Sequence, residues 1–295
     1  MIRAMCYDRS DSGDRTAQGC LMAEEPEDPH DTDVFATGRS PQCRFIHFDT
    51  VQGIARITLN RPPANLLAIE VLEDVALALE SLEYQREVKL VVLAAAGKYF
   101  SAGFELEDHL GDRGYIMLES FRRVFEVLFK LDKPTLAVVA GPALGAGSIL
   151  AMACDIVLAA TSVKFAYHEI KAGVFNPVTA VLLPRLIGRH RALEIVLGGA
   201  SLGASEAADL GLISRAIPDA QLDTEVEAVV ARFRELSAPV LQSARRAMVG
   251  ALDLPFAEAM RHAEDVYLNQ LMATEDATEG LRAVGAKRKP VWKDR

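Results

Sequence analysis

Two glycine-rich segments of the sequence could present backbone N–H groups to a negatively charged atom. The first is GPALGAGSILAMACDI, Gly141 to Ile156, in which three glycines and a proline precede an apolar helical segment. The second is GKYFSAGFELEDH (97–109), which also follows an apolar run and leads into an acidic helical start. Glycine before a helix often means that backbone amides come close to an anion.

The anion could be a phosphate group or the oxyanion of a reacting carbonyl. The phosphate-loop pattern GxxxxGK[ST] is absent, and GPALGAG does not match GxGxxG, so neither nucleotide-binding pattern fits. Two tight turns could instead aim two amide donors at one point and stabilise the charge that develops on a carbonyl oxygen. The small residues could equally serve only to let the turns pack closely, and the residues by themselves leave both interpretations open.

The segments that must position these turns alternate between strand and helix patterns. RFIHFDT and GIARITL alternate apolar and polar residues around Gln52-Gly53, which predicts a β-hairpin. Continuous apolar runs at 88–96, 135–140 and 155–160 are typical of buried strands. Helical spacing of apolar residues follows at Val71 to Leu82 and at 117–131. This alternation predicts an α/β fold, and the chain becomes mainly helical after about residue 188.

Composition narrows the class of protein. The 295 residues carry a formal net charge of −9, which argues against nucleic acid or an anionic membrane as a partner. No apolar run reaches the roughly 18–20 residues that span a bilayer, and the polar N-terminus does not resemble a signal peptide, so we expect a cytoplasmic protein. The four cysteines form no CxxC pair, and we expect no metal site.

Residues 1–40 differ from the rest of the chain. They hold four Arg against nine Asp plus Glu, a net charge of −5, and few bulky apolar residues. This composition predicts a disordered acidic extension, either inert or used as an interaction tail.

Six segments in order resemble the crotonase superfamily, the enoyl-CoA hydratase/isomerase family. They are ITLNRPPANLL, VVLAAAGKYFSAGFELEDH, KPTLAVVAGPALGAGSILAMACDIVLAA, VKFAYHEIKAGVFNPVTAVLLPRLIG, GASLGASEAADLGLISRAI and AKRKPVWKD. The resemblance implies a core of ββα spiral turns that binds acyl-CoA, at 41–220. It also implies a C-terminal helical region at 221–295 that assembles a homotrimer or a dimer of trimers. Coenzyme A would enter as part of the substrate, with no separate cofactor.

The resemblance also assigns roles to residues. It places the two oxyanion-binding amides on Phe104 and Ala146. It places Asn65, Leu66 and Ala102 along the adenine and pantetheine of the substrate. Lys287, Arg288 and Lys289 match a basic stretch that lies near the CoA phosphates, often of a neighbouring subunit, although a plain basic tail is the alternative.

The acid/base residues only partly match the family. Hydratases of this family typically use two glutamates, and the second of these corresponds to Glu169 in FAYHEIKAG. The slot of the first is occupied by Ile149, which can neither accept a proton nor hold a water molecule. Glu105, Asp108 and His109 are the candidates for a second acid or base; a helix start favoured by the dipole is the alternative for each.

These observations leave three functions to compare. The first is hydration or dehydration of an unsaturated, cyclic or branched, acyl-CoA, because AGVFNPVTAVLLPRLIG lacks the family's glycine cluster and resembles cyclic dienoyl-CoA hydratases. The second is an isomerase in which Glu169 alone moves a proton between two carbons. The third is a non-catalytic binder of CoA thioesters.

Overall fold

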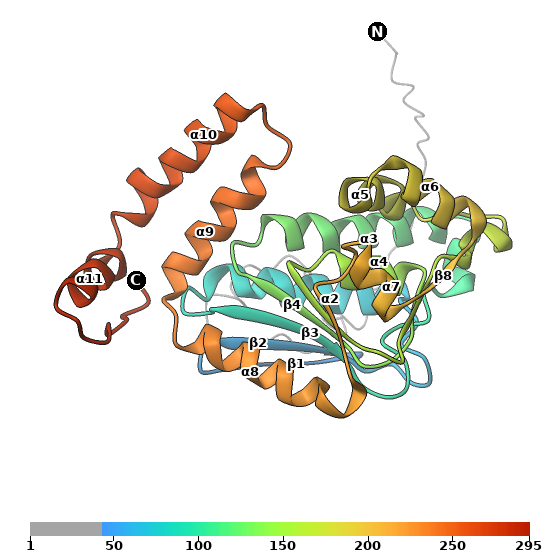
Figure 1. Ribbon diagram of the computed structural model, residues 1–295. Helices are drawn as coiled ribbons and strands as arrows, with labels where there is room; N and C mark the ends of the chain where they lie inside the picture. Colours follow the sequence, from blue (N-terminus) through green and yellow to red (C-terminus); the bar gives the residue numbers. More distant parts are fainter. Residues whose placement is uncertain (1–42) are drawn as a thin grey trace, which may run out of the picture.

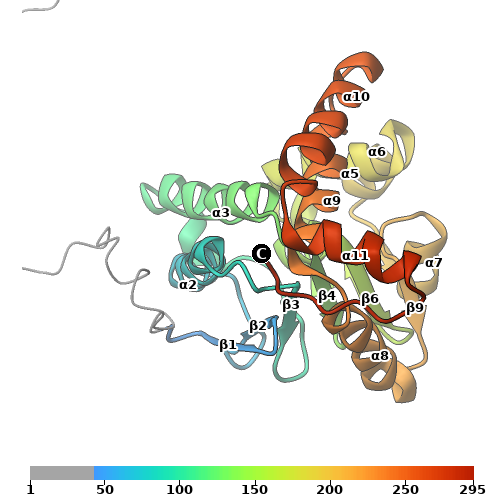
Figure 2. The same cartoon turned by 90° about the vertical axis from the view of Figure 1, so that its left-hand side faces the viewer.

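The structure is a computed structural model that describes residues 43–295, so the acidic extension predicted at 1–40 lies outside it. Two sheets form the centre of the described chain. The larger sheet has the strand order β1 (Ile46–Val51), β2 (Ile54–Leu59), β3 (Leu90–Ala95), β4 (Thr135–Val139), β6 (Ile156–Ala160) and β9 (Arg215–Ile217). Figure 2 shows these strands side by side in this order.

The predicted hairpin is confirmed. Strands β1 and β2 pair antiparallel, with Ile46 opposite Leu59, while every later neighbour in the larger sheet is parallel. Gln52 and Gly53 have φ angles of 51° and 73°, both positive, as a two-residue turn requires when its twist matches that of the strands. The apolar runs at 88–96, 135–140 and 155–160 contain strands β3, β4 and β6, also as predicted.

The smaller sheet was not predicted. Its strands are β5 (Ala143–Leu144), β7 (Lys164–Ala166) and β8 (Ser201–Gly203), and the single bridge between Ser101 and Ala143 extends the same row. Strands of two or three residues are too short to show an alternating pattern in the sequence. The middle turns of the chain each use a strand of the larger sheet, then a short segment of this row, then a helix.

Helices cover both faces of the larger sheet. They are α2 (Ile69–Ser81), α3 (Arg113–Lys130), α4 (Ala146–Met152), α5 (Pro177–Ile187), α6 (Arg189–Gly198), α7 (Ala204–Asp209) and α8 (Leu222–Arg234). Helices α2 and α3 lie over one face and α8 over the other (Figure 1). Helix α8 buries Val226, Val229 and Val230 in the same core as the strands, so it belongs to the body of the protein.

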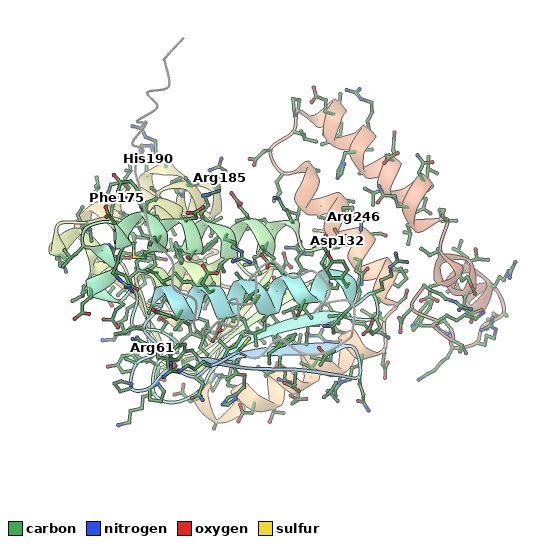
Figure 3. The ribbon with its side chains drawn as sticks, turned by 180° about the vertical axis from the view of Figure 1, so that it is seen from behind. Arg61, Asp132, Phe175, Arg185, His190 and Arg246 are labelled. Carbon is green, nitrogen blue, oxygen red and sulfur yellow. The ribbon has the colours of Figure 1, made fainter. Side chains whose placement is uncertain are left out.

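The remaining helices stand away from the sheet: α9 (Ala238–Ala251), α10 (Phe256–Asp265), the π-helix η5 (Val266–Leu271) and α11 (Glu275–Gly285) (Figures 1 and 2). Two arginines of α9 attach this C-terminal arm (residues 238–295). The buried Arg245 donates to the Asp155 carboxylate at 2.7 Å and to the Leu128 carbonyl at 3.2 Å. Arg246 pairs with Asp132, where the arm meets the body (Figure 3).

The chain end folds back onto the arm's start. The fully buried carboxylate of Asp276 accepts hydrogen bonds from the Ser237 hydroxyl and from the backbone amides of Lys293 and Asp294. In residues 43–295 no helix combines the length and apolar character needed to cross a bilayer. The expected cytoplasmic location stays a prediction.

Candidate active site

The two glycine-rich turns meet in the structure. The Leu144 amide donates to the Ser101 carbonyl at 2.8 Å, which joins the second turn to the first. A Cβ atom on Gly147 would lie 2.6 Å from Ser101 Cβ, and one on Gly103 would lie 3.2 Å from the Leu144 carbonyl oxygen. The turns can therefore touch only because these two residues have no side chain.

Two backbone amides are left unpaired where the turns meet. Phe104 follows Gly103, whose φ is +100°, and Ala146 is the first residue of α4 after Gly145. Neither amide donates a hydrogen bond to another group of residues 43–295. A Cβ on Gly103 would stand 3.9 Å from the Ala146 nitrogen, so the two turns bring these amides into one region. Such a pair of preorganised donors can stabilise an oxyanion.

Glu169 lies directly against the turn at Gly145. It sits in the short 3-10 helix η3 (His168–Ala172), and its Oε1 would be 2.6 Å from a Cβ on Gly145. Gly145 has φ 52° and ψ −120°, a conformation that only glycine adopts readily. Oε1 is buried and has no hydrogen-bond partner among the described residues. Removal from water raises the pKa of Glu169, because burial disfavours the charged carboxylate.

The neighbours of Glu169 are apolar or uncharged. Tyr167 is buried and its hydroxyl contacts Met152 Sδ at 2.9 Å, while burial and the nearby Glu169 raise the pKa of Tyr167. His168 is exposed. Ile149, in the slot of the missing glutamate, is 0 % exposed inside α4, where an unpaired carboxylate would be strongly unfavourable.

Of the three candidates for a second acid or base, two form ion pairs with arginines in the described chain and one does not. Glu105 pairs with Arg61 at 2.8 Å. Asp108 is buried. Its carboxylate accepts a hydrogen bond from the Ile69 amide at the start of α2 and forms an ion pair with Arg113. The His109 ring packs edge-on against the Phe104 ring, 5.4 Å between centroids, and forms no hydrogen bond or ion pair with the described chain.

The residues expected along the CoA portion of the substrate lie in or beside the turn at 101–104. The Ala102 amide donates to Ala64 at 2.9 Å and the Leu67 amide to Gly103 at 2.8 Å, so Leu66 and Ala102 are brought together. The Asn65 side chain forms hydrogen bonds within the protein. Its oxygen accepts one from the Arg61 amide, and its nitrogen donates to the carbonyls of Ala96 and Tyr99. Leu66 and Ala102 are half-buried and remain accessible to a ligand.

The basic stretch 287–289 is far from this region. Lys287, Arg288 and Lys289 are exposed after α11, at the opposite end of the molecule from α5 and α6 (Figure 1). Arg288 pairs with Glu279 through both terminal nitrogens. The stretch therefore does not reach Glu169 of its own chain.

Two polar residues that sequence reasoning missed lie next to Glu169. Asn176 and Thr179 line one small pocket with Glu169, and each has a buried side-chain atom without a partner in the described chain. The replacement of the family's glycine cluster by FNPVT was the available signal, but it gave no direction for these side chains. Among the described residues no three His, Cys, Asp or Glu side chains gather as a metal site would need.

Comparison with known proteins identifies the relatives of this chain. The model of the enoyl-CoA hydratase/isomerase family matches residues 49–295. A probable enoyl-CoA hydratase of Mycobacterium bovis is 36 % identical over 261 residues, covering 82 % of this chain and 90 % of that protein. A probable enoyl-CoA hydratase of Rhizobium meliloti is 34 % identical over 252 residues, covering 84 % of this chain and 97 % of the relative.

Solved structures agree with these relatives. The enoyl-CoA hydratase of Bacillus anthracis superimposes with a TM-score of 0.81 at 27 % identity, covering 85 % of this chain and 100 % of that one. The enoyl-CoA hydratase of Mycobacterium smegmatis gives a TM-score of 0.80 at 30 % identity, covering 84 % and 99 % of the two chains. The predicted α/β spiral fold with C-terminal helices is thereby confirmed.

Gly145→Ala is expected to lower the free energy of unfolding by about 2–5 kcal/mol, because it combines backbone strain with a clash against the Glu169 carboxylate. Chemical denaturation monitored by circular dichroism measures this. The control is Gly198→Ala in the last turn of α6, where a Cβ meets no atom within 4 Å and stability should hold or rise. Equal stability of the two variants would contradict the geometry of the turn.

Glu169→Gln is expected to be more stable than the wild type at pH 7. The pKa of Glu169 is raised in the folded protein, so the ionised carboxylate destabilises the fold as the pH rises through the ordinary value of 4.5. The neutral amide avoids this, and its advantage should shrink as the pH falls toward 4.5. Unfolding curves at several pH values measure the difference. Glu119→Gln, on the exposed face of α3, should show no such trend.

Proposed function

The chain belongs to the enoyl-CoA hydratase/isomerase family of enzymes, and we propose that it adds water to, or removes water from, an unsaturated acyl-CoA thioester. One observation carries this proposal: the Glu169 carboxylate lies against the Gly145-Ala146 turn, where the unpaired amides of Phe104 and Ala146 come together. A base and an oxyanion site are then available to the same substrate.

The reaction follows from this arrangement. The thioester carbonyl oxygen accepts hydrogen bonds from the Phe104 and Ala146 amides, which stabilise the enolate that forms as water attacks. The water oxygen bonds to C3, the electrons of the C2=C3 bond move into the enolate, and Glu169 takes the proton of the water. Glu169 then gives this proton to C2, and the carbonyl re-forms. Dehydration runs through the same steps in reverse.

Glu169 carries both proton transfers in this scheme. The carboxylates of Glu105 and Asp108 are held by Arg61 and Arg113, which leaves His109 as the candidate for a second acid or base. Burial raises the pKa of Glu169, which makes its carboxylate a stronger base than an ordinary glutamate for the first of these proton transfers.

The substrate class extends the proposal. Leu66 and Ala102 would line the pantetheine. The segment VFNPVTAVLLP has bulkier residues than the family's glycine cluster, and these would reshape the acyl pocket. We propose a cyclic or branched acyl group for this reason. Coenzyme A enters as part of the substrate, and the exposed Lys287 and Lys289 would meet its phosphates from a neighbouring subunit.

The fully buried Ile149 favours a second candidate function, double-bond isomerisation. Glu169 would remove a proton from C2 of a 3-enoyl thioester and return it to C4, which needs no water. Because the relatives are named enoyl-CoA hydratases, an enzyme is supported over a non-catalytic binder of CoA thioesters.

Turnover is tested with crotonyl-CoA, a 3-enoyl-CoA and a cyclic dienoyl-CoA, followed by absorbance and by the mass of the product. Hydration adds the mass of one water molecule, whereas isomerisation leaves the mass unchanged. Glu169→Gln should lower kcat at least about a hundredfold while CoA thioesters still bind. The control Glu119→Gln should behave as the wild type. Undiminished turnover by Glu169→Gln would sink the assignment of the base.

We further propose that the chain forms a homotrimer or a dimer of trimers. The C-terminal arm exposes large apolar side chains, among them Phe256 at 82 % and Leu268 at 63 %, which would be buried between subunits.

Light scattering during size exclusion should therefore give a mass of three or six chains of 32.0 kDa. Phe256→Glu combined with Leu268→Glu should shift the mass toward one chain, since a charge in an apolar interface is strongly unfavourable. Val51→Glu at the β1–β2 hairpin, also an exposed apolar position, should leave the assembly intact. A monomeric wild type would refute the assembly.

A further inference from the structure

A small cavity lies behind the Glu169 carboxylate. It is bounded by η3, the first turn of α5 and Val196 of α6, and its volume is about 10 Å³. Tyr167 lines it and its hydroxyl contacts Met152 Sδ. The other polar residues of the lining are Glu169, Asn176 and Thr179, and the last two are only 4 % and 3 % exposed.

Each of these three residues has one buried polar atom without a partner among residues 43–295: Glu169 Oε1, Asn176 Nδ2 and Thr179 Oγ1. The rest of the Asn176 amide is explained, because its Oδ1 accepts the backbone amides of Val178 and Thr179 and so begins α5. A buried polar atom without a partner destabilises the fold, and three such atoms belong to residues that line one cavity, so one shared partner would satisfy them together.

The chemistry of the three atoms identifies that partner. The volume matches the smallest space that holds one water molecule, and a buried water typically makes two to four hydrogen bonds. The Asn176 amide can only donate, the ionised Glu169 can only accept, and the Thr179 hydroxyl can do either. A water molecule that accepts from Asn176 and donates to Glu169 and Thr179 satisfies all three atoms.

We propose that Asn176 and Thr179 are positioning residues that hold one buried water molecule against Glu169 Oε1, and that this water fixes the catalytic carboxylate. The inference rests on the proposed role of Glu169. Oε1 is occupied by the water and by contact with Gly145, which leaves Oε2 to exchange the proton with the substrate. The fixed water thereby supplies part of the support that a second carboxylate would give, in a site where Ile149 gives none.

The charged surroundings of Glu169 do not provide this support. The titratable groups on its own segment and on the two helices beside it are Tyr167, His168, Lys171, Arg185, Arg189, His190, Arg191 and Glu194. None of them forms an ion pair or a hydrogen bond with Glu169. The exposed His190 and Arg185 are labelled in Figure 3 on the outer side of α5 and α6.

Substitutions at Thr179 test the positioning role. Thr179→Val keeps the shape and removes the hydroxyl, so kcat should fall roughly tenfold with KM within about twofold, the effect of one lost hydrogen bond. Thr179→Ser keeps the hydroxyl and should recover most of the loss. Equal kcat values for the valine variant and the wild type would overturn the role.

Asn176→Asp removes the side-chain N–H donor while keeping the oxygen that caps α5. Aspartate keeps the oxygen that begins α5 and is a favourable residue there, so the helix should remain stable. It replaces the amide donor by a second negative charge, which should raise the pKa of Glu169 and move the acid limb of the kcat/KM pH profile upward by about one unit or more. An unmoved limb would show that the side chain at position 176 does not act on the Glu169 carboxylate, and it would overturn the proposal.

A crystal structure that resolves ordered water tests the binding without any turnover. We expect one water molecule within hydrogen-bond distance of Glu169 Oε1, Asn176 Nδ2 and Thr179 Oγ1, and its loss in Thr179→Val. A dry cavity would overturn this inference alone, even if Glu169→Gln abolishes turnover. An ordered water together with full activity of Glu169→Gln would instead overturn the proposed function, and with it the positioning role.

Discussion

The close approach of two backbone turns is the constraint on which the site depends. Gly103 and Gly147 stand where the turns after β3 and β4 touch. A methyl group on Gly147 would collide with Ser101, and one on Gly103 would crowd the Leu144 carbonyl. Gly145 adds a backbone conformation that other residues avoid, and it lies under the Glu169 carboxylate. Because these three positions carry no side chain, the amides of Phe104 and Ala146 can point into one space. The proposed oxyanion site would therefore use the backbone of these segments rather than their side chains.

The second feature of the candidate site is the raised pKa of one carboxylate, that of Glu169. Glu169 is surrounded by buried apolar groups and by the neutral Tyr167, so its charged form is disfavoured and its pKa is raised. The burial that raises the pKa of Glu169 also destabilises the folded protein when the carboxylate ionises. The polar atoms of Asn176 and Thr179 are the nearby groups that can reduce this cost, through the water that we infer.

The C-terminal arm is attached to the body of the protein by contacts that do not involve the two glycine-rich turns. Arg245 crosses from α9 to Asp155 at the start of β6 and to the end of α3, and Asp276 closes the chain end onto Ser237. These buried polar contacts fix the direction of the arm while leaving apolar side chains such as Phe256 exposed. These exposed apolar side chains are the ones that the proposed subunit interface would bury.

The sequence by itself indicated the family and the main strands and helices, but not the smaller sheet. Periodicity located the hairpin, the strands β3, β4 and β6 and the helices α2 and α3, because each pattern is set by neighbours along the chain. Six motifs in order indicated the family, and glycine spacing indicated the two turns. Only the tertiary structure decided which polar residues are free to act. Asp108 accepts a hydrogen bond from the Ile69 amide, 39 residues earlier in the chain, at the start of α2. The Asn65 side chain donates to two carbonyls about 30 residues later. Asn176 and Thr179 line one pocket with Glu169. Such partners come from separate elements, and the direction of a side chain in space leaves no trace in local spacing.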